Sequence, residues 1–494
     1  MTTTSDYLTN LQSDKNRLTT VFNLDSSLTF TEIAEKAENG EIGGGGTVVE
    51  EKDVNFFDYD GTLVDSYTTS EFANLTTLPN NPSHEGLTAQ GWNWTLSDAQ
   101  NYVATYGQLD IGQMYTTDDG ATRIYISLED GRLEPYLGFS VNGSVTIDWG
   151  DGTSQMVTGT SVAISNIIYT QHTYAQAGKY VISLLSQNKI YFFGDSSKSS
   201  LILTKNATSG SLNRVYQNAI VKIELGSNAV LGSVKVFDQC FSLETITIPK
   251  GLTLTAYTYT QLFGMCYSLK CVVIPTTVTI IPDYTFTNCR SLNKIILPKQ
   301  TTYIGNYVFT QCNNLKKITM SDNTTNIGSY AFQWCSSIGE IKIPSSVTVF
   351  GLSAFQSCFS LEKVEFFGTP NNVQNFAFSS CVSLKAVKLP NSLTTLNASI
   401  FSGCTCLNNV KIPSTVTTLG NQVFNNCDGL AYLDFSKHTS IPSITSSSIY
   451  LPADAKIIVP DDLYDDWKVA TNWSNLASYI IKKSEWDGSG NANS

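Results

Sequence analysis

The chain has 494 residues, of which 41% are apolar, and its 42 acidic and 30 basic residues give a net charge of −12 and a pI near 4.8. This length is too great for one hydrophobic core and predicts several domains. The acidic balance excludes a general basic surface for coating nucleic acid, and no segment has the roughly 18 apolar residues that a membrane-spanning helix needs.

The first segment, residues 1–46, is predicted to contain two short helices followed by a flexible linker. A helix is expected within residues 5–22, where four apolar side chains recur at near-helical spacing: Leu8, Leu11, Leu18 and Val21. A second helix is expected from Thr29 to Lys36, and Gly43 to Gly46 form a flexible joint. The sequences of residues 7–15 and 30–34 resemble the N-termini of bacteriophage structural proteins, which implies an attachment segment. The polar N-terminus lacks the basic region and following apolar run of a secretion signal, so we expect a product made in the cytoplasm.

Residues 47–120 contain an apolar strand followed by the sequence Asp58-Tyr59-Asp60-Gly61-Thr62. This resembles the nucleophile motif of haloacid-dehalogenase phosphatases, but that chemistry also needs a lysine and a distal acidic pair for magnesium on a parallel α/β core. The following residues offer no such core. The later run Gly91-Trp92-Asn93-Trp94 instead resembles the small β-grasp repeats of internalin-B type. That resemblance implies a strand, an Asp-Gly hairpin turn, a second strand and a Gly-Trp closing strand.

Residues 121–197 carry the motif Ile147-Asp148-Trp149-Gly150-Asp151-Gly152-Thr153, followed by His172-Thr173-Tyr174. The motif resembles a PKD-type immunoglobulin-like domain, which implies a spacer role. Trp149 is expected to fill the core and Asp151-Gly152 to form a tight hairpin turn. Calcium binding by Asp148 and Asp151 stays open as the alternative to a role in the turn.

Residues 198–450 contain nine copies of one repeat, most of them 23 residues long. A cysteine marks each copy: Cys240, Cys266, Cys289, Cys312, Cys335, Cys358, Cys381, Cys404 and Cys427. A phenylalanine precedes each cysteine by three residues, from Phe237 to Phe424, and a Leu or Ile follows three residues later. Each copy then has an alternating strand such as Ile341-Lys342-Ile343, closed by a proline. The spacing predicts stacked coils that share one core, with the ladder cysteines reduced and buried and Cys271 and Cys406 as the exceptions.

The repeat sequence Ser329-Tyr330-Ala331-Phe332, with Cys335 and the strand at 341–343, resembles the BspA-like leucine-rich repeat family. The resemblance covers about residues 215–450 and implies a solenoid that serves in adhesion and recognition, with no catalytic residues. Residues 451–494, which include Trp467 and Trp473, resemble the C-terminal cap of such arrays.

The repeat sheet is the candidate binding surface because it is basic in an acidic chain. Residues 238–437 hold 13 Lys and Arg against 9 Asp and Glu, a local net of +4. Strand alternation predicts an outward column of Thr247, Val273, Ile296, Thr319, Lys342, Glu365, Lys388, Lys411 and Asp434, beside Lys294, Lys317, Lys363 and Tyr432. From these we select the candidate binding residues: Thr319, Lys342, Lys363, Glu365, Lys388 and Lys411. An anionic or sugar-rich ligand is one interpretation, and the other is that these charges only keep an open sheet soluble.

The whole chain is therefore expected to be mainly β: a helical N-terminus, a β-grasp-like module, a PKD-like sandwich, the repeats and a cap. The leading hypothesis is a bacteriophage virion protein, a fibre or decoration component that attaches through its N-terminus to capsid or tail proteins and displays the repeats to a host surface glycan or protein. The alternative is a bacterial surface adhesin of the BspA-like type, and a phosphatase is a further one. No cofactor or metal is expected, and no nucleic acid or membrane insertion. A homo-oligomer stays open.

Overall fold

The computed structural model describes residues 52–193, 202–203, 218–231, 235–252, 261–370 and 372–486. Lys52–Ser494 form one compact unit. The predicted attachment segment and glycine linker of residues 1–46 lie outside the described residues. The protein is mainly β, with 9% helix and 31% strand, and its dominant element is a β-solenoid of about 11 turns, which confirms the predicted fold class.

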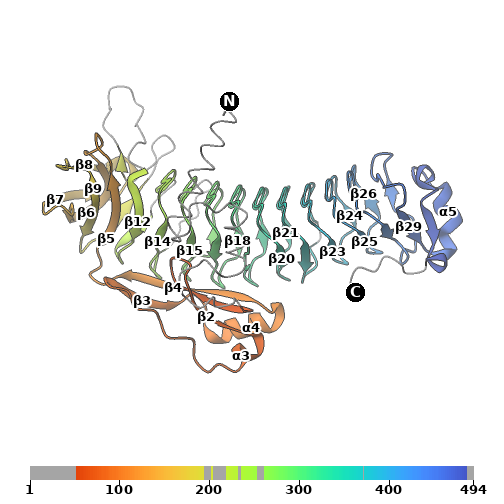
Figure 1. Ribbon diagram of the computed structural model, residues 1–494, viewed down its shortest axis with the longest axis horizontal. Coiled ribbons are helices and arrows are strands. Elements are labelled where there is room, and N and C mark those ends of the chain that lie inside the picture. Colours follow the sequence, from red (N-terminus) through yellow and green to blue (C-terminus); the bar gives the residue numbers. More distant parts are fainter. Residues whose placement is uncertain are drawn as a thin grey trace, which may run out of the picture. The chain divides into compact units, whose positions relative to one another are not determined.

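The first described part, residues 52–117, is a small module with one four-stranded sheet and two helices on one side of it (Figure 1). The chain order is β1 (Val54–Phe57), β2 (Leu63–Tyr67), α3 (Thr69–Ala73), β3 (Leu87–Trp92), α4 (Leu96–Tyr106) and β4 (Leu109–Thr117). The sheet order is β2-β1-β4-β3, with β1 parallel to β4 and the other pairs antiparallel. The module has a hydrophobic core of its own, which includes Phe56, Trp92 and Tyr102.

The predicted order of this module was incomplete, because it contained neither of the helices α3 and α4 and ended before β4. Helix α4 has clear local signals: Thr95 caps its N-terminus by accepting a hydrogen bond from the Asp98 N–H, and Gly107 ends it at φ 72°. The Asp-Gly hairpin turn between β1 and β2 is present. The N–H of Gly61 donates to the Asp58 carbonyl, and the N–H of Asp58 donates to the Thr62 carbonyl.

The next strands form one sheet that runs without interruption into the repeats. They are β5 (Thr122–Leu128), β6 (Tyr136–Asp148), β7 (Ser154–Ser161), β8 (Ile168–Gln171), β9 (Gly178–Leu185), β10 (Ile190–Phe192), β11 (Ile202–Leu203), β12 (Ile220–Glu224) and β13 (Ala229–Leu231), with a 3-10 turn η1 at Ile164–Asn166. The central path is β13-β10-β6-β9-β5-β12-β14. Because β12 pairs antiparallel with β5 and parallel with β14, residues 121–193 share a sheet and a core with the solenoid. The domain boundary at residue 197 stays a prediction.

The turn around Trp149 has the predicted structure. Trp149 is buried, its N–H donates to the Thr153 carbonyl, and Asp151 accepts hydrogen bonds from both the backbone N–H and the hydroxyl of Thr153. His172 stacks on the indole ring with a centroid distance of 4.8 Å, and its Nε2 lies 2.7 Å from the Asp151 carboxylate. These contacts give Asp151 a role in the turn.

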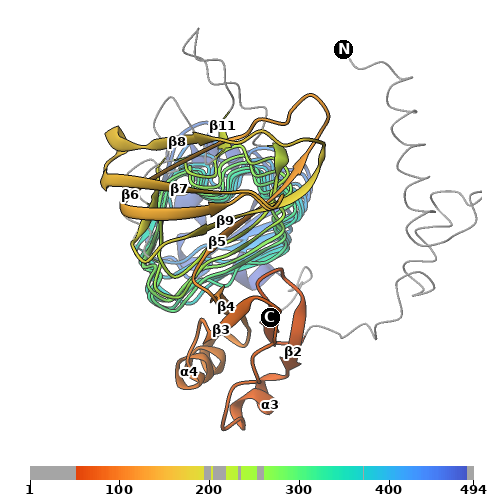
Figure 2. The ribbon, with the colours of Figure 1, turned by 90° about the vertical axis from the view of Figure 1, so that its left-hand side faces the viewer.

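The solenoid has a long main column of parallel strands, with one strand per turn except in the turn of residues 317–319, which has none. It continues after β12 with β14 (Thr245–Thr247), β15 (Cys271–Val273), β17 (Lys294–Ile296), β20 (Glu340–Ile343), β22 (Lys363–Phe366), β23 (Ala386–Lys388), β25 (Asn409–Lys411), β27 (Tyr432–Asp434), β29 (Lys456–Val459) and β30 (Ile480–Lys482). A shorter second column consists of β16 (Ile280–Ile281), β18 (Tyr303–Ile304), β19 (Asn326–Ile327), β21 (Val349–Phe350), β24 (Thr395–Leu396), β26 (Thr418–Leu419) and β28 (Ser443–Ile444). The view along the solenoid shows the turns superimposed (Figure 2).

The interior of the solenoid is built from ladders of identical side chains. The phenylalanine rings stack along the axis; Phe332, for example, lies 5.2 Å from Phe309 and 4.8 Å from Phe355 between ring centroids. All nine ladder cysteines are buried, as predicted. The thiol of Cys335 donates to the Phe309 carbonyl at 3.0 Å, and burial raises its pKa far above the ordinary value. Ladder thiols are therefore packing groups.

The C-terminal turns close the end of the core. After β29 come η3 (Asp461–Leu463), α5 (Tyr464–Val469), η4 (Trp473–Leu476), β30 and η5 (Lys483–Glu485). Trp467 and Trp473 are fully buried against Phe435, and the indole N–H of Trp473 donates to the Pro442 carbonyl at 2.7 Å. Two large aromatic side chains thus cover the apolar end that the last repeat exposes.

Candidate binding face of the repeats

We use the term outer face for the outward side chains of the main strand column, at the positions predicted above from strand alternation. Figure 1 and Figure 2 show the module of residues 52–117 on this side of the solenoid, with β4 nearest to the repeats. All nine residues of β4 are buried. Because one side of the module sheet packs on its own helices, the burial of β4 on both sides shows that its other side packs on the repeats.

A small apolar contact joins the module to the first part of the outer face. Phe57 and Met114 of the module pack with three buried side chains of the repeats: Cys271, Val273 and Ile296. The approach is closest at Gly112, where a Cβ would lie 2.6 Å from Val273 Cγ1 and 3.2 Å from Ile296 Cδ1. Only a residue without a side chain fits at this point of β4.

Ion pairs surround this apolar contact. Lys317 Nζ lies 3.0 Å from the Asp110 carboxylate, which is almost fully buried. Lys299 Nζ lies 2.6 Å from the Asp98 carboxylate, and this hydrogen bond lowers the pKa of Asp98 below its ordinary value. The two pairs match two basic side chains of the repeats with two acidic side chains of the module.

Hydrogen bonds to main-chain carbonyls complete the contact. The indole N–H of Trp94 donates to the Leu297 carbonyl at 3.0 Å, and the hydroxyl of Tyr102 donates to the Met320 carbonyl at 2.7 Å. In the opposite direction, Lys342 Nζ donates to the Tyr106 carbonyl at 2.8 Å. The module therefore covers the outer face from β14 to β20.

This cover corrects the predicted binding surface for two of its six residues. Thr319 is 8% exposed and Lys342 donates to the module, so neither lies on an open surface. Val273 and Ile296 of the same column are also buried. Alternation shows which side of a strand a residue faces, but it cannot show that another part of the chain packs on that side.

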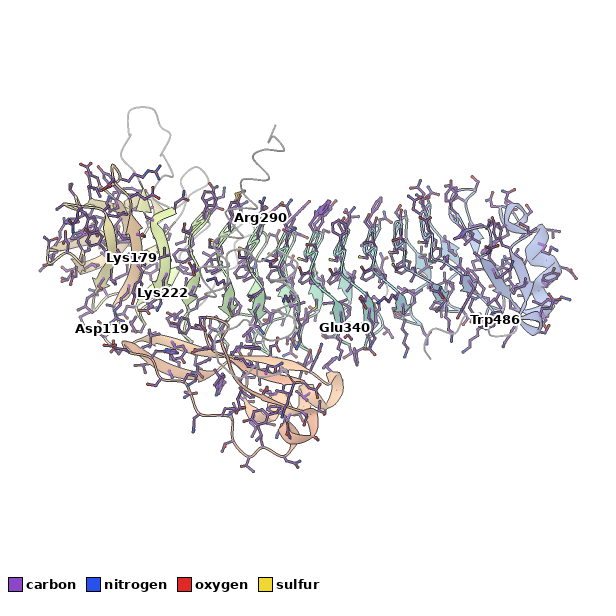
Figure 3. All side chains as sticks on the ribbon, viewed as in Figure 1. Asp119, Lys179, Lys222, Arg290, Glu340 and Trp486 are labelled. Carbon is purple, nitrogen blue, oxygen red and sulfur yellow. The ribbon has the colours of Figure 1, made fainter. Side chains whose placement is uncertain are left out.

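The other four predicted residues lie on the uncovered part of the outer face. We call this part the open face and define it by Lys363, Glu365, Lys388 and Lys411, which belong to β22, β23 and β25. Lys363, Lys388 and Lys411 are exposed and Glu365 is half-buried. At one end Tyr106 of the module packs on Phe367, and at the other Trp486 packs on Tyr432. Figure 3 shows Glu340 and Trp486 on this side of the solenoid.

The charges of the open face are unevenly paired. Lys363 Nζ lies 3.5 Å from a carboxylate oxygen of both Glu340 and Glu365. Partial burial lowers the pKa of Lys363, but the two carboxylates raise it by more, so the net shift is upward. Lys388 and Lys411 form no ion pair with any residue in the described part of the chain. Two exposed ammonium groups on successive turns are thus available to a ligand.

The residues of the phosphatase-like motif have structural roles. His84 Nε2 lies 2.6 Å from the buried carboxylate of Asp58, and Asp60 accepts a hydrogen bond from the Thr62 N–H within the hairpin turn. No group of three or more His, Cys, Asp or Glu side chains in the described residues could hold a metal ion. The other two histidines lie elsewhere: His172 stacks on Trp149, and His438 is buried in the solenoid.

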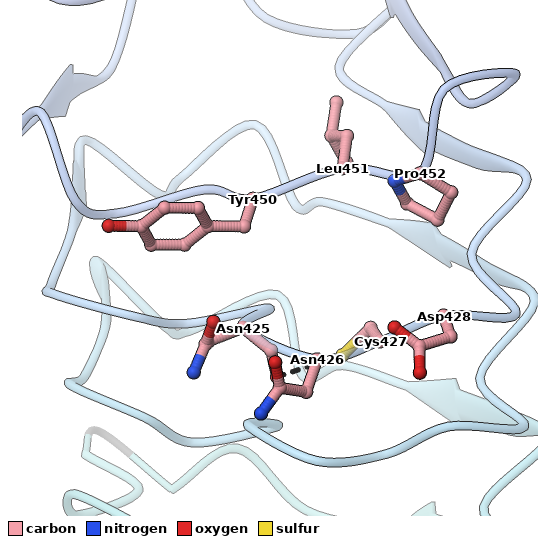
Figure 4. A pocket seen from close by; sticks show the side chains of 7 residues that line it. All are labelled: Asn425, Asn426, Cys427, Asp428, Tyr450, Leu451 and Pro452. Carbon is pink, nitrogen blue, oxygen red and sulfur yellow. Dashed lines mark hydrogen bonds between the residues drawn. The ribbon is translucent and has the colours of Figure 1, made fainter.

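A shallow pocket of about 260 Å³ lies beside the last repeats (Figure 4). It is lined by Asn425, Asn426, Cys427, Asp428, Tyr450, Leu451 and Pro452. Burial raises the pKa of Cys427 to about 12, so its thiol is protonated and unreactive at neutral pH. Asp428 is the only side chain of this lining that is charged at neutral pH. The pocket therefore has no converging charges for a ligand.

Comparison with known proteins places the repeats in a family. The BspA type leucine-rich repeat region matches residues 183–261, 256–382 and 371–464, in six copies. No curated protein sequence matches the chain. Among the described residues, no helix is long and apolar enough to cross a membrane.

Several solved structures are similar to part of the chain. A leucine-rich repeat protein from Bacteroides ovatus is 24% identical, over 52% of this chain and 69% of that one, with a TM-score of 0.34. The T. pallidum leucine-rich repeat protein is 26% identical over 38% of this chain and 83% of that one, with a TM-score of 0.28. A leucine-rich cell surface protein from Faecalibacterium prausnitzii is 18% identical over 59% and 93%, with a TM-score of 0.27.

Proposed function

Because this chain belongs to the BspA type leucine-rich repeat family, we propose that it is a recognition protein of a bacterial cell surface, an adhesin, and not an enzyme. The observation that carries the proposal is the open face, where Lys388 and Lys411 lie exposed without carboxylate partners in the described part of the chain. A solenoid presents such side chains on a rigid, extended surface, which suits the binding of a large ligand.

The covered half of the outer face is excluded from this proposal. Thr319 and Lys342 are already in contact with the module, so the binding residues that we retain are Lys363, Glu365, Lys388 and Lys411. Lys388 and Lys411 supply the net positive charge, and the ligand is expected to carry negative charge.

Adhesion should depend on these two lysines. Beads coated with the Lys388→Ser/Lys411→Ser chain are expected to lose about tenfold or more in adsorption to a cell surface that retains the wild-type chain, since truncating close charge contacts costs about 2 kcal/mol or more. Adsorption of the wild type should also weaken as salt screens the lysines. The matched control is Lys385→Ser, an exposed lysine of the same coil that already pairs with Glu362 at 2.7 Å.

Equal adsorption of the double variant and the wild type would refute the open face as the binding site. The cellular location is tested separately by immunogold labelling with an antibody against the chain. Labelling of intact bacterial surfaces supports the adhesin. Labelling of purified phage particles instead would support the virion hypothesis and the attachment role of residues 1–46, for which the family match gives no support.

A further inference from the structure

The contact under the module displays the chemistry that the outer face can bind. Two lysines of the repeats pair with aspartates, Lys299 with Asp98 and Lys317 with Asp110. A third lysine, Lys294, lies 3.1 Å from the ring centroid of Phe57. The partner in each case is a side chain of a folded polypeptide, and it combines carboxylates with aromatic rings.

The module also binds the outer face through aromatic side-chain donors and a main-chain carbonyl, a combination that a polypeptide provides. Trp94 and Tyr102 donate to the carbonyls of Leu297 and Met320, while the Tyr106 carbonyl accepts from Lys342. Donors of the module thus meet carbonyls of the repeats, and lysines of the repeats meet acceptors of the module. Hydrogen bonds are therefore donated from the module to the repeats and from the repeats to the module.

The interface is polar for a contact inside one chain. Three of its buried side-chain oxygens have no hydrogen-bond partner among the described residues: Thr116 Oγ1, Thr247 Oγ1 and Thr319 Oγ1. The module's own core and the solenoid core are separate clusters, and the apolar contact between them is small. Such a surface resembles an interface between two proteins more than the interior of a domain.

The open face continues this interface in the same register. Lys363 is two turns beyond Lys317 in one outward column, and Lys388 and Lys411 are two and three turns beyond Lys342 in the other. The strands that carry the last pair, β23 and β25, directly follow the strands at the module's edge, where Tyr106 packs on Phe367. Successive turns lie about 4.8 Å apart, so neighbouring lysines present charge at a regular short interval.

We infer that the open face binds an acidic polypeptide surface of another protein, next to the module and through the same kinds of contact. This inference rests on the proposed function and narrows its ligand to one class. The partner supplies carboxylates to Lys388 and Lys411, and an aromatic side chain against Phe367, which is half-buried at the edge of the module. A polyuronate glycan could neutralise the lysines, but it lacks the aromatic rings that the covered half uses.

Three polyanions distinguish the ligand classes when their binding to the full chain is measured at matched carboxylate concentration: a random copolymer of glutamate and tyrosine, poly-glutamate, and polygalacturonate. We expect affinity to fall in that order. The Lys388→Ser/Lys411→Ser chain should bind the copolymer about tenfold or more weakly. Lys385→Ser, which removes the same kind of charge from a lysine already paired with Glu362, should change it little.

Each outcome has one meaning. Tighter binding of polygalacturonate, lost in the double variant, would overturn the polypeptide inference and leave the open face as an adhesive site. Copolymer binding that both the double variant and Lys385→Ser reduce equally would show attraction by overall charge alone, and would overturn the inference together with the site. Copolymer binding that only the double variant loses supports both.

Discussion

Replacing Phe332 by alanine is expected to lower the free energy of unfolding by about 3–5 kcal/mol, since it removes a large side chain from a close-packed core and leaves a cavity. Phe332 is fully buried and stacks between Phe309 and Phe355 in the middle of the ladder. Each turn contacts only its neighbours, so the loss should weaken the coupling between the two halves of the solenoid. Urea denaturation followed by far-UV circular dichroism measures the change.

Phe376→Ala is the matched control because Phe376 is a phenylalanine of the same solenoid with its side chain 38% exposed. Its loss should change stability by roughly 0.5 kcal/mol or less. If the two variants were destabilised equally, the stacked ring ladder would not be the source of the solenoid's stability.

The docking of the module should be visible in the reactivity of the Cys271 thiol, which the module covers. In the native chain Cys406 is exposed and the other ten cysteines are buried, so titration with a thiol reagent should find one reactive group. Cys271, predicted from its off-ladder position to be a second exception, is fully buried because Phe57 and Met114 of the module cover it. Burial raises its pKa to about 12.

Gly112→Leu should expose this thiol. The new side chain would occupy the space of Val273, since even a Cβ at Gly112 would lie 2.6 Å from Val273 Cγ1. The module is therefore expected to move away from the repeats, and a second cysteine should react in the folded chain. Ala104→Leu also introduces a leucine, on the exposed side of α4, and should leave one reactive thiol.

A complementary pair keeps this test independent of misfolding. Gly112→Ala should raise the reactivity of Cys271, and adding Val273→Ala should restore protection, because it removes the two Cγ atoms that obstruct the new methyl group. A folded Gly112→Leu chain that still shows one reactive thiol would contradict the docking of β4 on the repeats.

The repeats could be predicted from the sequence because their information is periodic. The Phe and Cys columns fix the coil length and the buried side, and the structure places them in the core. The end turns could not be found in this way. The first strand β12 and the last strand β30 continue the main column, but their turns have no phenylalanine or cysteine of the ladder. At the first end β12 packs on β5 instead. At the other end Trp467 and Trp473 cover the core after β27.

Two further features have no signal in a single sequence. Tyr330 and Trp334 have φ values of 59° and 63°, a left-handed conformation for which glycine is the usual residue. In this solenoid the hydrogen bonds between turns hold them there, for example from the Tyr330 N–H to the Leu352 carbonyl at 2.8 Å. The cover over Thr319 and Lys342 is a tertiary contact between segments more than 200 residues apart, as the 236-residue separation of Tyr106 and Lys342 shows.

The most direct test of the open face as the recognition surface is a footprint with a single cysteine. Ala386, an exposed residue between Lys363 and Lys388 on the open face, is replaced by cysteine in a Cys406→Ser chain; the control carries Val349→Cys, at a position 50% exposed in the second strand column. Thiol labelling is compared in solution and on a cell surface that retains the chain. We expect binding to protect the cysteine at position 386 and leave the one at 349 reactive. Equal labelling of position 386 in both states would contradict the account.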